Sequence, residues 1–219
     1  LRDAYGSTEN LCHGTGWIHN DEPVPGCVGR PYDNNVQVRI SDRGEIQFKS
    51  KGVMVGYYLE PEKTAEVLEN GWYRTGDSGK IDENGNLWIT GRISEVFKTS
   101  KGKFIKPAAL ENHFAYNHYL SQFCIMGHGM TQPVLVCTLS DSGRAVKAAE
   151  LQVKLEHMLK KINNGLPAHE LVSKIYVVPE WTIANGLLTP TLKVKRKEIE
   201  AAYRAVIEGD ETEDRVVFV

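Results

Sequence analysis

The sequence lacks the features that mark several large classes of protein. Its 219 residues hold no apolar run near the roughly 20 residues that a membrane span needs, and no basic-then-apolar signal pattern opens it. Its seven histidines show no H-E-x-x-H or other metal-binding spacing. We therefore expect a cytoplasmic protein with no transmembrane span, although a peripheral contact with a membrane remains compatible with the sequence.

Cysteine and net charge are also scarce. The cysteines show no C-x-x-C spacing, which argues against a zinc site and against a redox dithiol (Cys12, Cys27, Cys124 and Cys137). Lysine and arginine number 26 against 28 aspartates and glutamates, so the formal charge is −2 and nucleic acid is a disfavoured partner. With 41% hydrophobic and 25% charged residues, the composition is that of an ordinary globular protein.

The first part of the chain is rich in short strand patterns. Apolar-alternating runs at VQVRI, EIQFK and LWIT are separated by turn signals. Asn84-Gly85 predicts a two-residue hairpin turn, because both residues tolerate the positive φ that such a turn needs. One helix is predicted between the hairpins, with Pro61 at its first position and Gly71 just past its end.

After Arg92 the pattern changes to mixed helices and strands. Strands are predicted at EVFK, FI, QFCIM, VLVCTL and KIYVVPEW, and a helix begins at Pro107. Apolar residues at helical intervals predict a long helix over 144–162, and a short basic helix follows over 193–203. The acidic tail GDETED is expected to be solvated. The fold class is therefore α+β, with a boundary near residues 92–95.

Five motifs follow one another along nearly the whole chain: YGSTEN, GEIQFKSKGVMVGYYLEPEKT, YRTGD, GRISEVFKTSKGKFIKPAALE and LTPTLKVKR. Each motif alone is weak to moderate evidence, whereas five in this order are strong evidence. Together they resemble the adenylate-forming, AMP-binding superfamily, which includes acyl-CoA synthetases, peptide-synthetase adenylation domains and luciferases. The last motif looks like that of the long-chain fatty-acid–CoA ligases.

The resemblance implies an enzyme that converts a carboxylic acid, ATP and coenzyme A to acyl-CoA, AMP and pyrophosphate through an acyl-adenylate. It implies that residues 1–92 are the C-terminal part of a large adenylation domain, with a nucleotide-binding loop and a β-rich, distorted barrel-like subdomain. Residues 93–219 would be its small mobile α+β C-terminal domain. Because LRDAYGSTEN opens on a polar loop, we expect a C-terminal fragment that is inactive alone.

By resemblance, YGSTEN is a nucleotide-binding and catalytic segment. Tyr5 would pack on the adenine beside Gly6, and Thr8 would touch the α-phosphate. Glu9 would help hold Mg²⁺, a hard cation suited to carboxylate and phosphate oxygens. Taken without the other motifs, this segment is a polar turn with an incidental glutamate.

Asp77 in YRTGD resembles the family's ribose anchor, since an ionised carboxylate can accept hydrogen bonds from both hydroxyls of a vicinal diol. Arg92 would add a contact to the ribose or the phosphate. The alternatives are a structural aspartate in a turn and a surface salt bridge that contributes little.

Lys193 in TPTLK lies where the family places a mobile catalytic lysine, whose ammonium bridges the carboxylate and the α-phosphate oxygens. Lys195 is the competing candidate, and both lysines could instead be solvated charges. Many members carry glycine immediately before this lysine, whereas Leu192 stands here.

The segment after GR has a second implied role. Ser94 matches the hinge about which the family's C-terminal domain rotates. The turn Thr99, Ser100, Lys101 and Gly102 would then line the route of coenzyme A. A plain β-hairpin turn explains these four residues equally well.

Two other functions remain open. In the first, the acyl-adenylate is loaded onto a carrier protein, although FKTSKGKFIKPAALE argues against a peptide synthetase. In the second, the chain is a non-catalytic binding relative, and the intact set of Glu9, Asp77, Arg92 and Lys193 speaks against that. A fatty acid is the expected carboxylic acid.

Overall fold

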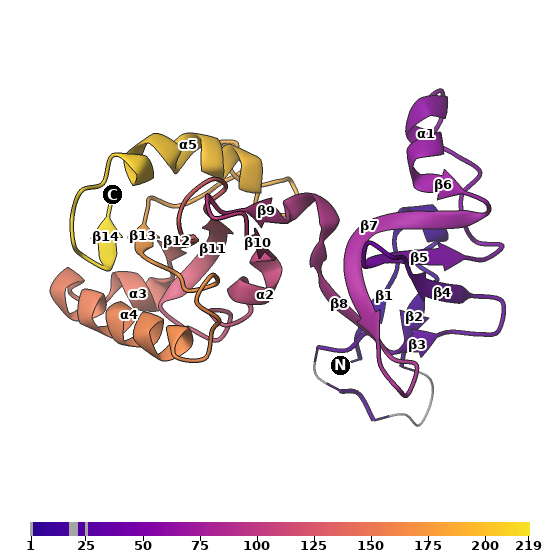
Figure 1. Ribbon diagram of the computed structural model, residues 1–219, viewed down its shortest axis with the longest axis horizontal. Coiled ribbons are helices and arrows are strands. Elements are labelled where there is room, and N and C mark those ends of the chain that lie inside the picture. Colours follow the sequence, from indigo (N-terminus) through magenta and orange to yellow (C-terminus); the bar gives the residue numbers. More distant parts are fainter. Residues whose placement is uncertain (1, 18–21, 25) are drawn as a thin grey trace. The chain divides into compact units, whose positions relative to one another are not determined.

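The computed structural model describes residues 2–17, 22–24 and 26–219. The chain divides into two compact units, unit 1 (Leu1–Glu95) and unit 2 (Val96–Val219). Unit 1 consists mostly of strands, and unit 2 has helices on both faces of a sheet (Figure 1). The α+β class predicted from the sequence is confirmed.

Unit 1 is built on a curled antiparallel sheet (Figure 1). Its strands lie in the order β4 (Gln37–Ile40), β5 (Glu45–Lys49), β7 (Trp72–Ile81) and β6 (Leu68–Glu69), and β8 (Leu87–Arg92) also pairs with β7. A smaller sheet and three helical segments accompany it: β1 (Ala4–Tyr5), β2 (Thr15–Gly16), β3 (Arg30–Pro31), η1 (Thr8–Asn10), α1 (Pro61–Val67) and η2 (Ile93–Glu95).

Strand β5 is buried on both faces, which places two polar side chains inside unit 1. Ile46 and Phe48 are almost fully buried in an apolar cluster with Leu87. The alternating residues Glu45 and Gln47 point to the other face and are only 6% and 5% exposed. A buried carboxylate at Glu45 needs partners, and these define the site described below.

The loop between β7 and β8 differs from the predicted two-residue turn. Gly85 has φ +79°, but Asn84 does not adopt the left-handed conformation that the predicted turn requires. Instead the Gly85 amide donates to the Asp82 carbonyl, and the Asp82 amide donates to the Asn86 carbonyl, both at 3.0 Å. The Asp82 carboxylate stabilises this longer loop, and hydrogen bonds from the Trp88 indole and the Asn86 amide lower its pKa to about 2.

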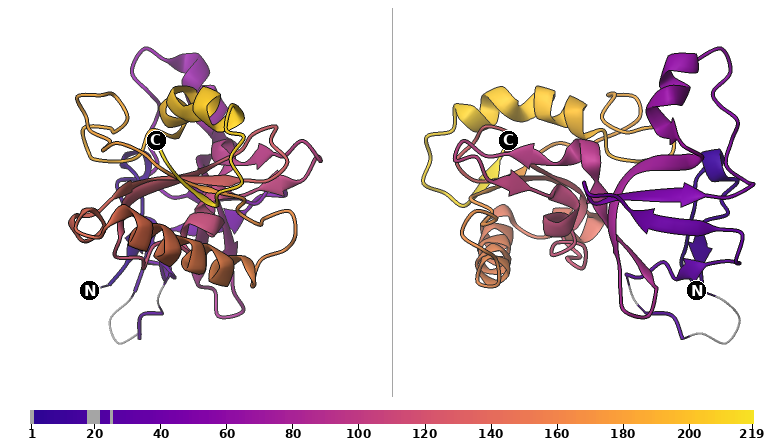
Figure 2. Two further views of the ribbon diagram at one scale, coloured as in Figure 1. Left: turned by 90° about the vertical axis from the view of Figure 1, so that its left-hand side faces the viewer. Right: turned by 45° about the vertical axis from the view of Figure 1, so that its right-hand side comes forward.

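Unit 2 is a mixed four-stranded sheet between helices. Strands β11 and β12 are antiparallel, whereas β12, β13 and β14 are parallel neighbours. Figure 2 shows α4 on one face of this sheet and α5 on the other. The elements are β9 (Phe97–Lys98), β10 (Phe104–Ile105), α2 (Pro107–Glu111), β11 (Leu120–Met126), β12 (Val134–Leu139), α3 (Asp141–Arg144), α4 (Ala148–Asn163), β13 (Ile175–Val177), α5 (Arg196–Glu208) and β14 (Val216–Phe218).

Both faces of the sheet in unit 2 are apolar because helices cover both. On β12, Leu135 and Cys137 pack toward α4, while Val134 and Val136 lie in the cluster that contains residues of α5. Three leucines at four-residue intervals give α4 one continuous apolar face (Leu151, Leu155 and Leu159). The sequence of β12, VLVCTL, is therefore a nearly continuous apolar run with one buried threonine, and not an alternating pattern.

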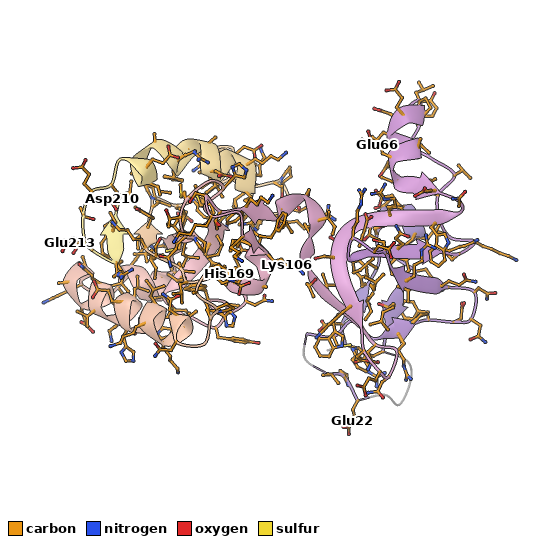
Figure 3. All side chains as sticks on the ribbon, in the orientation of Figure 1. Glu22, Glu66, Lys106, His169, Asp210 and Glu213 are labelled. Carbon is orange, nitrogen blue, oxygen red and sulfur yellow. The ribbon has the colours of Figure 1, made fainter. Side chains whose placement is uncertain are left out.

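The C-terminal segment is held to the sheet by Asp210, whereas the other five residues of GDETED are exposed, as expected of a solvated tail. The Asp210 side chain is 7% exposed and lies between the end of α5 and β14 (Figure 3). Lys174 Nζ lies 2.7 Å from its carboxylate, and the Tyr176 hydroxyl donates to it at 2.8 Å. These contacts precede β14, a strand that the sequence pattern did not reveal.

We predict that Asp210→Asn destabilises unit 2 at neutral pH by roughly 1–3 kcal/mol, because Lys174 loses its anionic partner. The hydrogen bond from Lys174 lowers the pKa of Asp210 below its usual value. The stabilisation is therefore fully present above the ordinary aspartate pKa of about 3.9, and it is lost as the pH falls through the lower folded-state pKa. Hydrogen exchange of the β13 amides at neutral and acidic pH measures both effects.

Asp141→Asn is the matched control, because the Asp141 side chain is 99% exposed in its pair with Arg144. An exposed pair contributes little to stability. Equal destabilisation by the two substitutions would contradict the role given to Asp210.

Candidate functional site

A cavity of about 620 Å³ in unit 1 brings several of the predicted site residues together. Tyr5, Gly6, Glu9, Asp77 and Arg92 all line it. Residues that carried no predicted role also line it: Ser7, Glu45, Tyr57, Glu66, Val67, Tyr73, Arg74, Thr75 and Gly76. Glu66 belongs to α1 (Figure 3), so loop, helix and sheet residues all contribute to the lining.

The register of two strands places Asp77 beside Arg92. These residues are direct partners across the β7–β8 pair, and Arg92 Nη1 donates to Asp77 Oδ1 at 2.7 Å. The pairing of β7 with β5 is irregular nearby, and Gly76 has φ +74°, which glycine adopts without strain. This irregularity in the pairing of β7 therefore presents the carboxylate to the cavity, with a guanidinium on one side.

Tyr5 contacts the other carboxylate oxygen of Asp77. Its hydroxyl donates to Asp77 Oδ2, and burial together with this hydrogen bond raises the pKa of Tyr5. The ring of Tyr5 lies 5.7 Å from that of Phe48, centroid to centroid. A carboxylate has about four lone-pair sites, so Asp77 keeps acceptor capacity for a further ligand.

Glu45 is a site residue that sequence reasoning missed. Its buried carboxylate accepts hydrogen bonds from the Gly76 amide at 3.0 Å and from Arg74 Nε at 3.1 Å. It therefore holds the backbone next to Asp77 in place. The available signal was a glutamate at the start of a strand, in the motif GEIQFK, whose alternate residues are apolar.

Glu9 points to the same cavity from η1. The Tyr57 hydroxyl donates to Glu9 Oε1 at 2.8 Å, and burial with this hydrogen bond raises the pKa of Tyr57 to about 12. Burial opposes ionisation of Glu9, but hydrogen bonds from the backbone and from Tyr57 outweigh it and lower its pKa. Glu9 is thus a carboxylate that stays ionised at neutral pH.

One ionised carboxylate supplies only part of the coordination shell of Mg²⁺, so the ion needs further oxygen ligands. Among the residues that the structure describes, no group of three or more histidine, cysteine, aspartate or glutamate side chains could hold a metal ion. Mg²⁺ commonly uses one or two carboxylates together with substrate phosphates and water. The donor set around Glu9 therefore suits a Mg²⁺ ion that arrives with a phosphate ligand.

The loop before η1 depends on Gly6. A Cβ atom at Gly6 would lie 2.5 Å from the carbonyl carbon of Cys12, closer than real Cβ atoms come. The Cys12 amide donates to the Ser7 carbonyl at 2.7 Å, and the Ser7 amide donates to Asn10 Oδ1 at 2.7 Å. Gly6 is therefore needed for this close backbone approach, whatever it contacts in a ligand.

Other predicted site residues are not among those that line this cavity. Thr8 is exposed and is not among the lining residues, and Ser94 is exposed on η2 beside the division between the units. In the β9–β10 turn, Ser100, Lys101 and Gly102 are exposed, and Gly102 has φ +73°.

Thr99 differs from the rest of this turn because it is only 5% exposed. Its hydroxyl accepts a hydrogen bond from the Lys103 amide at 3.2 Å. The side chain therefore stabilises the hairpin from within, and the three exposed residues are the ones available to a ligand.

Lys193 lies in a narrow loop in unit 2, directly before the bridge that closes the loop. Leu188 and Val194 form an antiparallel bridge at its base. The Thr189 amide donates to the Lys193 carbonyl at 2.8 Å, and the Lys193 amide donates to Thr189 Oγ1 at 3.0 Å. The Lys193 side chain is exposed, and within residues 2–17, 22–24 and 26–219 it makes no ion pair. Its ammonium is thus available to an anionic ligand.

Lys195, the competing candidate, is already engaged. Its Nζ lies 3.2 Å from Glu198 Oε1 in the first turn of α5. The geometry favours Lys193 as the lysine that is available for chemistry.

Comparison with known proteins identifies the family. The model of the AMP-binding enzyme C-terminal domain matches residues 95–211, more than half of the chain. The chain belongs to this family. The resemblance drawn from the five motifs is thereby confirmed, and the relatives of this chain include long-chain fatty-acid–CoA ligases.

Two curated relatives show how much of such an enzyme the chain covers. The long-chain-fatty-acid–CoA ligase FadD15 of Mycobacterium tuberculosis is 31% identical over 84% of this chain and 34% of its own length. The long-chain-fatty-acid–CoA ligase 5 of Mus musculus is 33% identical over 94% of this chain and 35% of its own length. The chain spans about a third of the length of the curated relatives it matches.

Solved structures agree on the fold. The anthranilate CoA ligase AuaEII, in complex with anthranoyl-AMP, matches 94% of this chain and 40% of its own with a TM-score of 0.77 at 19% identity. The adenylation domain of a carboxylate reductase from Mycobacterium chelonae matches 94% of this chain and 34% of its own with a TM-score of 0.73 at 22% identity. In the described part of the chain, no helix is long and apolar enough to span a bilayer.

We predict that Glu45→Gln weakens AMP binding about tenfold, or about 1.4 kcal/mol. The reason is that the buried carboxylate, which accepts hydrogen bonds from the Gly76 amide and from Arg74, loses its charge. The measurement is calorimetric titration of AMP into a chimaera in which this chain replaces the matched third of the M. tuberculosis relative. Asp77→Ala, which removes the carboxylate expected to accept hydrogen bonds from AMP, provides the reference for complete loss of binding.

Glu69→Gln is the control for this titration, because it removes the same charge from the exposed strand β6, outside the cavity. It should change the affinity less than about twofold. A similar loss of AMP affinity in Glu45→Gln and Glu69→Gln would mean that overall charge, and not the contacts of Glu45 with Gly76 and Arg74, controls binding.

Leu192 explains why glycine suits the position before the lysine. It has φ +60° and is 65% exposed, so its side chain contributes little packing to offset the conformational cost. We predict that Leu192→Gly changes the free energy of unfolding by less than about 0.5 kcal/mol, because relief of strain offsets the greater freedom of glycine when unfolded. Leu192→Val should lower it by roughly 1–2 kcal/mol, since β-branched residues tolerate positive φ poorly. Urea unfolding of the wild type and the two variants measures both changes. Equal stability of the wild type and Leu192→Val would contradict the proposed backbone strain at this position.

Proposed function

We propose that this chain is the C-terminal portion of an AMP-forming acyl-CoA synthetase that acts on fatty acids. The observation that supports it best is the cavity in which Asp77, Arg92, Tyr5 and Glu9 meet, together with Lys193 of unit 2, which is exposed and has no ion pair among the described residues. The exposure and the partners of these five residues are compatible with the roles that the motifs suggest for them. A cytoplasmic location is part of the proposal.

The first half-reaction joins two anions. A fatty-acid carboxylate oxygen attacks the α-phosphorus of ATP, the bond to the bridging oxygen breaks, and pyrophosphate leaves, which gives acyl-AMP. Asp77 would accept hydrogen bonds from the ribose hydroxyls, because two of its lone-pair sites remain after Tyr5 and Arg92 are bound. Arg92 next to Asp77 offsets negative charge at the same place.

Glu9 and Lys193 supply the charges for this step. Mg²⁺, when bound by Glu9 and phosphate oxygens, would neutralise charge on the phosphates. The ammonium of Lys193 would stabilise the developing charge on the carboxylate and α-phosphate oxygens. Thr8 would contact the α-phosphate from its exposed position on η1.

The second half-reaction transfers the acyl group. The thiolate of coenzyme A attacks the acyl carbonyl carbon, and AMP leaves. Ser94, exposed where the two units divide, is the proposed hinge for presenting the β9–β10 hairpin. Residues 98–106 carry four exposed lysines and no acid, which suits the phosphates of coenzyme A (Lys98, Lys101, Lys103 and Lys106).

Two alternatives share this site. Carrier-protein loading would use the same adenylation, and product analysis with coenzyme A or with a carrier protein as acceptor separates the two. A non-catalytic binding relative would form no acyl-AMP at all. The exposed Lys193, without an ion pair in the described part of the chain, favours catalysis, because a binding scaffold gains nothing from it.

We predict that Lys193→Ala in the chimaera lowers acyl-AMP formation at least about 100-fold, because the developing charge loses its ammonium partner. Thioester formation from supplied acyl-AMP should change less than about threefold, since that step does not use Lys193. Pyrophosphate release and acyl-CoA formation report the two steps separately.

Lys195→Ala serves as the control, because its ammonium is paired with Glu198. It should leave both half-reactions within about threefold of the wild type. Equal loss of both steps in Lys193→Ala, or a larger loss in Lys195→Ala, would count against the assignment.

A further inference from the structure

A buried ion pair lies at the base of the loop that carries Lys193. Arg196 is the first residue of α5, Glu111 is the last residue of α2, and both side chains are less than a fifth exposed. Arg196 Nη1 donates to Glu111 Oε1 at 2.6 Å, and Nη2 donates to Oε2 at 3.1 Å. A two-pronged arginine–carboxylate contact fixes orientation as well as distance.

The same two side chains also form hydrogen bonds with strand β11 of the sheet. The Ile125 amide of β11 donates to Glu111 Oε1 at 2.8 Å, and Arg196 Nη1 donates to the Ile125 carbonyl at 2.7 Å. Arg196 Nη1 also lies 3.0 Å from Cys124 Sγ. The pair therefore joins α2, β11 and the start of α5 at one point, and we call it the Glu111–Arg196 lock.

The lock is close to Lys193 along the backbone, with two residues between Lys193 and Arg196. The Lys195 amide donates to the Leu187 carbonyl at 3.0 Å, and Leu187 is buried in the apolar cluster that contains Trp181. One stem of the loop is thus held by apolar packing and the other by the lock. The loop residues between the two stems bond to one another through backbone groups and the Thr189 hydroxyl, and the Lys193 side chain is exposed.

We propose that Glu111 and Arg196 are positioning residues for Lys193. This inference rests on the proposed function, in which the Lys193 ammonium must meet two anions at a defined place. Catalytic groups need to be held within about 0.5 Å, and a displacement of about 1 Å can cost about 100-fold in rate. The lock acts through the backbone of residues 193–196, without touching a substrate.

Lock variants in the chimaera give the first readout. Glu111→Gln keeps an acceptor for the Ile125 amide but removes the charge, and Arg196→Lys keeps the charge but removes the two-pronged contact. Each should lower acyl-AMP formation about 10- to 100-fold and change thioester formation from supplied acyl-AMP less than about threefold. The double variant should lose no more than the more severe single variant, because both residues form one unit.

Hydrogen exchange on the 219-residue chain gives a readout that needs no catalysis. The amides of Leu192 and Lys193 donate within the loop, to the Thr189 carbonyl and the Thr189 hydroxyl. In either lock variant these two amides should exchange about tenfold faster, because the stem no longer fixes the loop.

Asp210→Asn is the matched control, since it breaks another buried ion pair just past the opposite end of α5. It should lower stability yet leave both the ratio of the half-reactions and the exchange at Leu192 and Lys193 unchanged. If the lock variants lower both half-reactions equally, the pair is only structural and the proposal is overturned. If the wild-type chimaera forms no acyl-AMP, the proposed function fails, whereas unchanged exchange would overturn the lock by itself.

Discussion

A carboxylate that leaves water must be met by cations and N–H groups, and four such carboxylates organise this protein. Each is less than a fifth exposed and lies at a point where separate segments meet. The four pairs are Glu45–Arg74, Asp77–Arg92, Glu111–Arg196 and Asp210–Lys174. In three of them a backbone amide also donates to the carboxylate, so that removing the cation would leave a costly buried charge.

These pairs divide the charged residues into structural and available ones. Glu45 and Arg74 are occupied with each other and with the backbone, whereas Asp77 retains lone pairs that face a cavity. In unit 2, Lys195 is neutralised by Glu198, whereas Lys193 has no ion pair with any residue that the structure describes. The available charges are therefore supported by neighbours that are already satisfied, which is how a rigid scaffold can present reactive groups.

Much of the secondary structure could be predicted because local pattern and tertiary burial agree. Strand β12 coincides with the apolar run VLVCTL, and the leucines of α4 recur every four residues. Prediction failed where a side chain redirected the backbone. The Asp82 carboxylate accepts hydrogen bonds from two backbone amides and an indole, and these stabilise a longer loop in place of the expected two-residue turn. Asp210 likewise binds Lys174 just before the parallel strand β14, which the sequence pattern did not reveal.

The sequence by itself determined the family, because the order of five motifs along the chain needs no knowledge of contacts. It also determined the fold class, since strand and helix periodicities are local properties. Only the tertiary structure decided which charges meet. Arg196 and Glu111 are 85 residues apart, and Glu45 and Gly76 are 31 apart. The physical reason is that a buried carboxylate is satisfied by whatever donor the fold brings within about 3 Å, and one-dimensional spacing does not encode that distance.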